Sequence, residues 1–423
     1  MSQRMRALHL GLHPHRAALA VTAGRFRPEL YHGGVGSPLR VAQIDAPARP
    51  PGWVRIAPTL AGVCASDRKM LQLTALGRPL LAFSGLPREG VVPGHEVVGR
   101  VLEADPSSGF APGDRVVPEP VLGCEHKGFV ACRRCRDGDA HRCAHQADAG
   151  TAAPGLGFGF HARFGGGWAE QLVAPADRVH RVPDHLDDAT AVLAEPVAIA
   201  VHAVLRAGVL PGQRALVIGP GTIGLSVIRA LRGLIADVEV TAVGLDAFSD
   251  ALAIDAGAAR VLHGRRRELI EAAASATGSV LRGNRLTGLV LEDGYDVVID
   301  CVGSSQTIDD ALRTLRPGGR LVLLGTSGEQ SVDWTLLWHR ELTVTGSVFY
   351  GQEQVADGAS LPPGRRRAMA IALELLADGE PWRLVTHRFA LDEPVPALAT
   401  AAAGPGAQAV KVVFDLTAVA PRS

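Results

Sequence analysis

The chain has 423 residues, more than one hydrophobic core usually supports, so we expect two domains. Lysine plus arginine and aspartate plus glutamate each number 43, and the basic residues form no stripe with interleaved aromatic residues. This composition indicates neither a nucleic acid nor an anionic membrane as a partner. A neutral small molecule is therefore the expected substrate.

The sequence holds no run of about eighteen uncharged apolar residues, the length that predicts a membrane-spanning helix. Near the start, the run His13 to Arg16 interrupts the apolar core that a secretory signal needs. We therefore expect a cytoplasmic location. In such a reducing compartment, the crowding of four cysteines between Cys124 and Cys143 favours a metal site over disulfides.

Short β-like runs separated by proline and glycine fill about the first 190 residues, which predicts an antiparallel, barrel-like domain. These runs are Trp53 to Ile56, Val97 to Leu102, Arg115 to Val117 and Ala169 to Val173.

From about Ala194, strands and helices alternate, which predicts a parallel, doubly wound α/β sheet. A helix is expected at Leu225 to Leu234. The expected strands are Ala215 to Ile218, Val238 to Val243, Asp296 to Asp300, Arg320 to Leu324 and Leu342 to Val348.

After Tyr350, a helix around Arg366 to Leu376 and a strand at Val410 to Phe414 follow without another nucleotide-binding turn. We therefore assign this tail to the first domain. The predicted domains are residues 1–195 with 350–423, and residues 196–349.

A glycine-rich turn follows the first buried strand of the second domain and opens a helix. Glycines there allow backbone amides and the helix N-terminus to approach a pyrophosphate, so the turn predicts a dinucleotide site. The residues of this predicted site are Gly219, Gly221, Thr222, Ile223 and Gly224.

In such folds an acidic residue about twenty positions further on binds the ribose hydroxyls. Gly244 stands near the expected place, and Asp246 follows two residues later. Either Asp246 binds the ribose from a slightly extended loop, or the site accepts a 2′-phosphate. The cofactor is therefore NAD or NADP, and we favour NAD.

The cysteine cluster has the spacing of a structural zinc site. Cys132, Cys135 and Cys143, preceded by Cys124, can supply the four ligands of a closed tetrahedral centre. His126 also lies close enough in the sequence to compete with Cys124 as the fourth ligand.

A catalytic zinc takes about three protein ligands and leaves a position for substrate. Cys64, His95, Glu96 and Glu195 are candidates for these ligands, although each alone also fits a purely structural role. Ser66, two residues after Cys64, carries a hydroxyl that can take a proton from a zinc-bound alcohol.

Taken in order, these motifs resemble the zinc-dependent medium-chain dehydrogenase/reductase family, which includes alcohol, sorbitol, threonine and sugar dehydrogenases, over nearly the whole chain. The resemblance implies a GroES-like, mostly antiparallel catalytic domain followed by a Rossmann domain. The matching stretches are Gly62 to Asp67, Gly94 to Gly99, Gly167 to Val173, Val182 to Asp184, Leu193 to Pro196 with His202, Arg316 to Arg320, and Leu324 with Gly325.

The resemblance implies that Cys64, His95 and Glu96 bind the catalytic zinc. It places Glu195 where alcohol dehydrogenases proper carry a cysteine, as in the polyol, sugar and threonine branch. Glu96 and Glu195 are thus alternative third ligands. Asp67 is implied to bond the His95 imidazole and fix its tautomer.

Val302, Leu324 and Ser347 fall where the family's backbone meets the nicotinamide. The resemblance implies a homodimer or homotetramer that transfers a hydride between NAD(P) and a secondary alcohol, such as a polyol, sugar, cyclitol or amino alcohol. The alternatives are an NADPH-dependent carbonyl reductase on the same scaffold and a non-catalytic zinc-binding protein.

Two departures from the family pattern stand out. Lys69 occupies the place of a histidine that ends the proton relay in many members. Residues Glu125 to Ala131 form an insertion where the family has a two-residue gap, which leaves the choice between Cys124 and His126 open.

Overall fold

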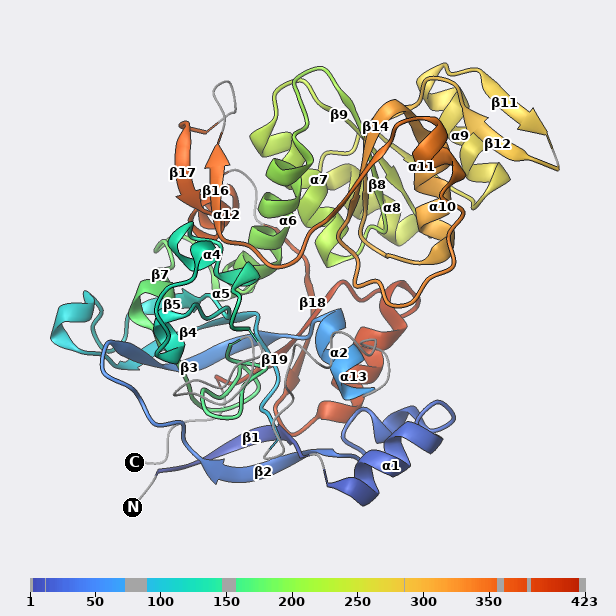
Figure 1. The fold of residues 1–423 in the computed structure, drawn as a ribbon. Coiled ribbons are helices and arrows are strands. Elements are labelled where there is room, and N and C mark those ends of the chain that lie inside the picture. The colour runs from blue at the N-terminus through green and yellow to red at the C-terminus, as the bar shows by residue number, and fades with distance from the viewer. Residues whose placement is uncertain are drawn as a thin grey trace. The chain divides into compact units, whose positions relative to one another are not determined.

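The computed structural model describes residues 3–417, except 12, 73–89, 147–156, 285, 356–360 and 379–381. The chain divides into two compact units (Figure 1): Met1–Glu195 with Ala372–Ser423, and Pro196–Ile371. It passes from one unit to the other within helices α6 (Ala194–Ala207) and α12 (Ala368–Ala377). Among the described residues, no helix has the length and apolar character needed to cross a lipid bilayer.

The first unit is built on a seven-stranded sheet in the order β18-β19-β3-β4-β5-β7, with β6 beside β3. All of its pairings are antiparallel except β18 with β19. The strands are β3 (Trp53–Gly62), β4 (Val97–Glu103), β5 (Arg115–Pro118), β6 (Leu172–Pro175), β7 (Val179–Arg181), β18 (Val385–Ala390) and β19 (Lys411–Asp415).

A separate antiparallel ribbon, β1 (Arg4–Leu10) with β2 (Leu39–Asp45), completes the strands of this unit in the described part of the chain. Helix α1 (Pro14–Ala23) lies between these two strands in the sequence and was not expected. The other helices are α2 (Ala65–Leu71), α4 (Arg133–Arg136), α5 (Asp188–Ala191) and α13 (Pro394–Ala403). Short 3-10 turns are η1 (Pro28–Leu30), η2 (Pro106–Ser108), η3 (Glu125–Lys127), η4 (Ala140–Arg142), η5 (Ala176–Arg178) and η6 (Gly404–Ala407).

The second unit holds a six-stranded parallel sheet in the order β10-β9-β8-β13-β14-β15, with helices on both sides of it (Figure 1). The strand order reverses between β8 and β13, the place where doubly wound sheets bind nucleotides. The strands are β8 (Arg214–Ile218), β9 (Glu239–Val243), β10 (Arg260–Leu262), β13 (Tyr295–Asp300), β14 (Leu315–Leu323) and β15 (Thr343–Gly346). The helices are α7 (Thr222–Leu234), α8 (Ala247–Asp255), α9 (Arg267–Thr277), α10 (Ser305–Thr314) and α11 (Thr335–His339).

The central strands of this sheet are apolar on both faces because helices cover both. Leu216 and Ile218 of β8 and Val298 of β13 are almost completely buried in one cluster with α9 and α10 residues. Helix α7 turns Leu225, Ile228 and Leu231 inward. The glycine-rich turn at Gly219 is therefore held between a buried strand, β8, and a packed helix, α7.

Two hairpins in the second unit were not expected. Strands β11 (Leu281–Asn284) and β12 (Gly288–Leu291) follow α9, and β16 (Gln352–Val355) pairs with β17 (Gly364–Arg367). Glu353 of β16 lies 2.8 Å from Nδ1 of His202 on α6, which ties the second hairpin to this unit. Residues 350–371 therefore stay with the nucleotide-binding unit, and the chain returns to the first unit at Ala372 rather than at residue 350.

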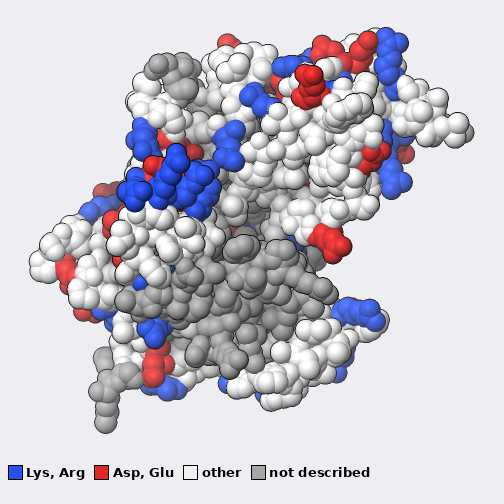
Figure 2. Space-filling model, in the orientation of Figure 1, with Lys and Arg blue, Asp and Glu red and all other residues white. Residues whose placement is uncertain are grey.

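On the face shown in Figure 2, basic and acidic side chains are mostly interspersed. Basic side chains gather over α4, which carries Arg133, Arg134 and Arg136 around Cys135.

Candidate functional site

Cys64 stands at the junction of β3 and α2, where it is the N-cap of the helix. Its backbone N–H donates to Oδ2 of Asp67 at 3.0 Å, and Oδ1 of the same carboxylate lies 3.3 Å from Nδ1 of His95. Asp67 is completely buried. One carboxylate thus binds the start of the helix and lies beside Nδ1 of the imidazole, the nitrogen that Asp67 is expected to contact.

His95 precedes β4 and packs against Phe160, with ring centroids 4.8 Å apart. Its Nε2 lies 3.5 Å from Oγ of Ser66, on the first turn of α2. Burial lowers the pKa of His95, but Asp67 and Cys64 outweigh that effect and raise it well above its usual value. The Ser66 hydroxyl thus lies at the Nε2 side of the imidazole, opposite the side that faces Asp67.

Glu96 is held by a lysine from the far end of the chain. Nζ of Lys411, the first residue of β19, donates to both Glu96 oxygens, at 2.8 and 2.6 Å, and to the carbonyl of Val63 at 3.4 Å. Both side chains are buried. Burial lowers the pKa of Lys411, yet the Glu96 carboxylate raises it overall, so the pair is ionic. No sequence motif pointed to Lys411 as part of the site.

Glu195 lies in the first turn of α6 and is 2% exposed. Neither carboxylate oxygen has a hydrogen-bond partner among the described residues. Burial raises the pKa of Glu195 to about 8, with His95 and Lys411 opposing the shift and Glu96 adding to it. A buried carboxylate without a donor is unfavourable unless a cation completes it.

The donor set around His95 suits zinc. Ligand atoms of Cys64, His95 and Glu96 lie within 4.8 Å of one another. This grouping contains Glu96 rather than Glu195, but Glu96 is already paired with Lys411, whereas both Glu195 oxygens are partnerless. A carboxylate engaged by an ammonium group is a poorer ligand, so the Lys411 bonds favour Glu195 over Glu96 as the third ligand.

The four clustered cysteines also come together. The sulfurs of Cys124, Cys132, Cys135 and Cys143 lie within 4.8 Å of one another, and all four are free thiols. Backbone N–H groups donate to three of the sulfurs at 3.3 to 3.4 Å. Backbone hydrogen bonds lower the pKa of Cys132 to about 6, while burial raises that of Cys143 to about 11. The set fits the four thiolates of a closed zinc site.

His126 lies outside this cluster. Its Nδ1 accepts from the Gly123 N–H at 3.1 Å, and its Nε2 lies 3.1 Å from Asp177 Oδ1. Lys127, in the same insertion, is fully buried, and its Nζ donates to the carbonyls of His145 and Gln146 at 3.2 and 3.0 Å. The insertion therefore folds back onto the segment after Cys143, which accounts for the longer spacing after Cys124.

The glycine-rich turn has the geometry expected of a dinucleotide site. Gly219 has a φ of +93°, a conformation that L side chains rarely adopt. A Cβ on Gly224 would lie 2.1 Å from the Gly219 carbonyl oxygen, whereas one on Gly221 would meet nothing within 4 Å. The turn is thus tight on its sheet side and open at the N-terminus of α7, next to Thr222 and Ile223, as a pyrophosphate requires.

The three residues expected near the nicotinamide all follow strand ends of the parallel sheet. Oδ1 of buried Asp300 accepts from the Val302 N–H at 2.9 Å, and the Asp300 carbonyl accepts from Leu324 N at 2.9 Å. Ser347 N donates to the Leu323 carbonyl at 2.9 Å, and its buried Oγ has no partner in the described part of the structure. These backbone bonds hold all three residues at the same edge of the sheet as Gly219.

Asp246 is the N-cap of α8, and its carboxylate accepts from the Ser249 N–H at 2.8 Å. This helix-capping role competes with the ribose contact expected from its position in the sequence.

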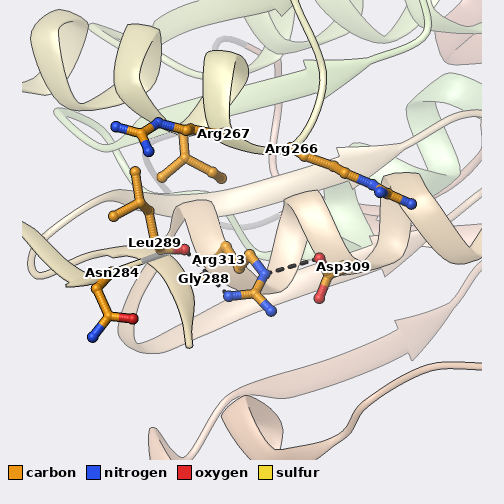
Figure 3. A pocket seen from close by; sticks show the side chains of 8 residues that line it. Arg266, Arg267, Asn284, Gly288, Leu289, Asp309 and Arg313 are labelled. Carbon is orange, nitrogen blue, oxygen red and sulfur yellow. Dashed lines mark hydrogen bonds and ion pairs between the residues drawn. The ribbon is translucent and has the colours of Figure 1, made fainter. Parts of the chain in front are cut away.

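A cavity of about 490 Å³ lies elsewhere in the second unit, beside α9, α10 and the β11–β12 hairpin. Figure 3 shows Arg313 turned toward Asp309. Nε of Arg313 donates to Oδ2 of Asp309 at 2.8 Å. No predicted site residue lines the cavity. Its lining residues are Arg266, Arg267, Ile270, Asn284, Gly288, Leu289, Asp309 and Arg313.

Comparisons with known proteins agree with this geometry. Residues 50–184 match the alcohol dehydrogenase GroES-like domain, and residues 222–361 match the zinc-binding dehydrogenase domain. An L-threonine 3-dehydrogenase of Anaeromyxobacter sp. (strain Fw109-5) is 30% identical over 355 residues, which covers 82% of this chain and 89% of that protein. The chain belongs to the zinc-dependent medium-chain dehydrogenase family.

Other similarities support the same assignment. An L-idonate 5-dehydrogenase of Vitis vinifera is 26% identical over 384 residues, covering 89% of this chain and 92% of that protein. The crystal structure of an Escherichia coli oxidoreductase of unknown specificity shares the fold, with a TM-score of 0.72 at 21% identity and coverage of 97% and 99%.

Family membership confirms the predicted fold class, a GroES-like domain with a Rossmann domain, and the predicted reaction class. This medium-chain dehydrogenase is a zinc-dependent oxidoreductase that acts on the CH–OH group of a small-molecule alcohol, with NAD or NADP as hydride partner.

The cysteine cluster generates a first prediction. Cys135→Ser should remove one zinc ion per chain and lower the unfolding temperature, because a closed four-ligand site contributes directly to folding. Metal analysis and thermal unfolding measure both effects. His126→Asn is the matched control and should keep all the zinc; zinc loss in that variant would contradict the all-cysteine site.

The Lys411–Glu96 pair generates a second prediction. Lys411→Ala should lower the free energy of unfolding by about 3–5 kcal/mol, because it leaves the buried Glu96 charge unpaired. Denaturant unfolding of the zinc-loaded protein measures the loss. The double variant Lys411→Met with Glu96→Gln should recover most of it. Equal losses in the single and double variants would argue against an ion pair.

Proposed function

We propose that this dehydrogenase oxidises a hydrophilic secondary alcohol, a polyol, sugar, cyclitol or amino alcohol, at a zinc held by Cys64, His95 and Glu195. The observation that carries the proposal is the buried Glu195 carboxylate, which has no hydrogen-bond partner among the described residues. The substrate class is supported by the relatives named for L-threonine and L-idonate, both of which carry secondary hydroxyl groups.

When bound, zinc acts as a Lewis acid that lowers the pKa of the substrate hydroxyl. The protein supplies the orientation. Asp67 faces Nδ1 of His95 at 3.3 Å, so the opposite nitrogen, Nε2, is the one available as a ligand. Phe160 packs on the same ring and limits its rotation.

Ser66 is the proposed proton acceptor from the substrate hydroxyl. Its Oγ lies 3.5 Å from His95 Nε2, at the edge of the proposed metal site. A hydroxyl both accepts and donates, so it can take the substrate proton while giving its own to water. Lys69, further along α2, can accept that proton only as the neutral amine. The nucleotide supplies the hydride acceptor, and the glycine-rich turn from Gly219 to Gly224 is proposed to hold its pyrophosphate.

Lys411 is proposed to keep Glu96 from the metal. It neutralises the carboxylate and occupies both of its oxygens, so Glu195 is left as the third ligand. A second zinc, held by Cys124, Cys132, Cys135 and Cys143, is proposed to be structural, because four thiolates leave no position for substrate.

We also propose that the protein assembles into a homodimer or homotetramer and that it is located in the cytoplasm.

The third prediction separates the two glutamates. Glu195→Gln should lose the catalytic zinc and lower kcat/KM for a polyol or amino alcohol by at least about a hundredfold, because a neutral amide replaces a charged ligand. Glu96→Gln is the matched control and should keep two zinc ions per chain. Metal analysis and steady-state kinetics over an alcohol panel provide the measurements. Zinc loss confined to Glu96→Gln would reverse the assignment.

A further inference from the structure

The second strand of the parallel sheet ends without the acidic side chain that dinucleotide-binding folds usually place there. Strand β9 ends at Val243, and the next residue is Gly244, whose N–H donates to the Leu262 carbonyl at 2.8 Å. Asp246, two residues further on, caps α8. The position that usually contacts the adenosine ribose is therefore a glycine.

A carboxylate from the next helix fills the space beside that glycine. A Cβ on Gly244 would lie 1.9 Å from Oδ1 of Asp250 and 2.6 Å from Cγ1 of Val261. Asp250 belongs to the first turn of α8. Because atoms do not approach this closely, any side chain at position 244 would displace Asp250. The acidic group is thus present at the end of β9, but it comes from six residues later in the chain.

The two oxygens of this carboxylate have different surroundings. Oδ2 lies 3.0 Å from Nε2 of His263, in the loop after β10. Oδ1 is buried and has no hydrogen-bond partner among the described residues. A buried acceptor without a donor is unfavourable, and a ligand hydroxyl would satisfy it. The whole side chain is 24% exposed, so solvent reaches part of this side chain although Oδ1 itself is buried.

We propose that Asp250 binds the hydroxyls of the adenosine ribose in place of the acid missing at position 244, and that the site therefore selects NAD(H) over NADP(H). The inference rests on the proposed dehydrogenase function. A carboxylate accepts hydrogen bonds from the ribose hydroxyls, whereas it repels the doubly charged 2′-phosphate of NADP.

A rival arrangement would use basic residues after β10. His263, Arg265 and Arg266 follow that strand, and a 2′-phosphate would need their charges. His263 is already paired with Asp250, and the Arg266 backbone N–H is bonded to Asp310 Oδ1 at 3.1 Å. The bond to the Arg266 backbone fixes the start of α9. Figure 3 shows that the side chains of Arg266 and Arg267 extend from the helix in different directions. The charged group recorded beside position 244 is the Asp250 carboxylate.

The test measures the binding of NADH and of NADPH to the zinc-loaded protein in the absence of substrate. The fluorescence of the nicotinamide ring reports the binding. Wild type should bind NADH more tightly. Asp250→Asn should weaken NADH binding by about tenfold to a hundredfold, the loss typical of a hydrogen bond to a charged group, and leave NADPH binding equal or tighter. Asp255→Asn is the matched control, because it removes the same charge from the same helix at a side chain that is 75% exposed.

A relocation variant checks that the position of the charge matters. Asp250→Ala should lose the preference for NADH. Adding Gly244→Asp to Asp250→Ala should restore it, because the closest obstacle at position 244, the Asp250 carboxylate, is then gone and only the Val261 side chain has to shift. Asp246→Asn, which preserves helix capping, should leave the preference unchanged.

The possible failures are distinguishable. A wild-type protein that binds neither nucleotide would overturn the proposed function. A wild type that binds NADPH more tightly, or an Asp250→Asn variant with an unchanged preference, would overturn only the role of Asp250. If only Asp246→Asn changed the preference between NADH and NADPH, Asp246 in the loop after β9 would be the residue that binds the ribose.

Discussion

Burial of negative charge is the constraint around which the first unit is organised. Asp67, Glu96 and Glu195 are all buried near His95. Removing a carboxylate from water is costly unless donors or a cation replace the lost hydration. Asp67 has His95 and the Cys64 N–H, and Glu96 has Lys411. Among the described residues Glu195 has no hydrogen-bond donor, which is the basis for proposing that a metal cation binds this carboxylate.

This constraint also explains why the chain returns to the first unit after the nucleotide-binding unit. Strand β19 pairs with β3 from Leu60 to Gly62, the stretch that leads into Cys64. Its first residue, Lys411, thereby reaches Glu96 and the Val63 carbonyl. Strand β19 thus brings a charged side chain to the candidate site and also lies between β18 and β3 in the sheet. Its register with β3 is what delivers a positive charge to the buried acid.

Local patterns allowed much of this molecule to be predicted from the sequence. The apolar runs of β8 and β13 and the glycines at 219, 221 and 224 act through neighbouring residues, so spacing alone identified them. Lys411 was missed because it meets Glu96 across 315 residues, through strand register that no local pattern encodes. The hairpin β11–β12 was missed because its short, partly exposed strands lack a clear alternation. Asp246 is expected to contact the ribose because of its distance along the chain from the glycine-rich turn. That distance carries no information on the helix cap that engages its carboxylate.

Gly62 and Gly244 each adjoin a carboxylate, and the contrast between them separates a structural acid from a ligand-binding one. A Cβ on Gly62 would lie 1.9 Å from Glu96 Oε2, just as one on Gly244 would lie 1.9 Å from Asp250 Oδ1. Glu96 has an internal cation that satisfies both oxygens, so its burial is complete without a ligand. Within the described part of the chain, Asp250 has a partner on Oδ2 only, and Oδ1 lies beside Gly244 at the end of β9, the strand end where such folds bind nucleotides. A glycine at a motif position therefore does not mean that the acid is absent, because a neighbouring helix can supply it.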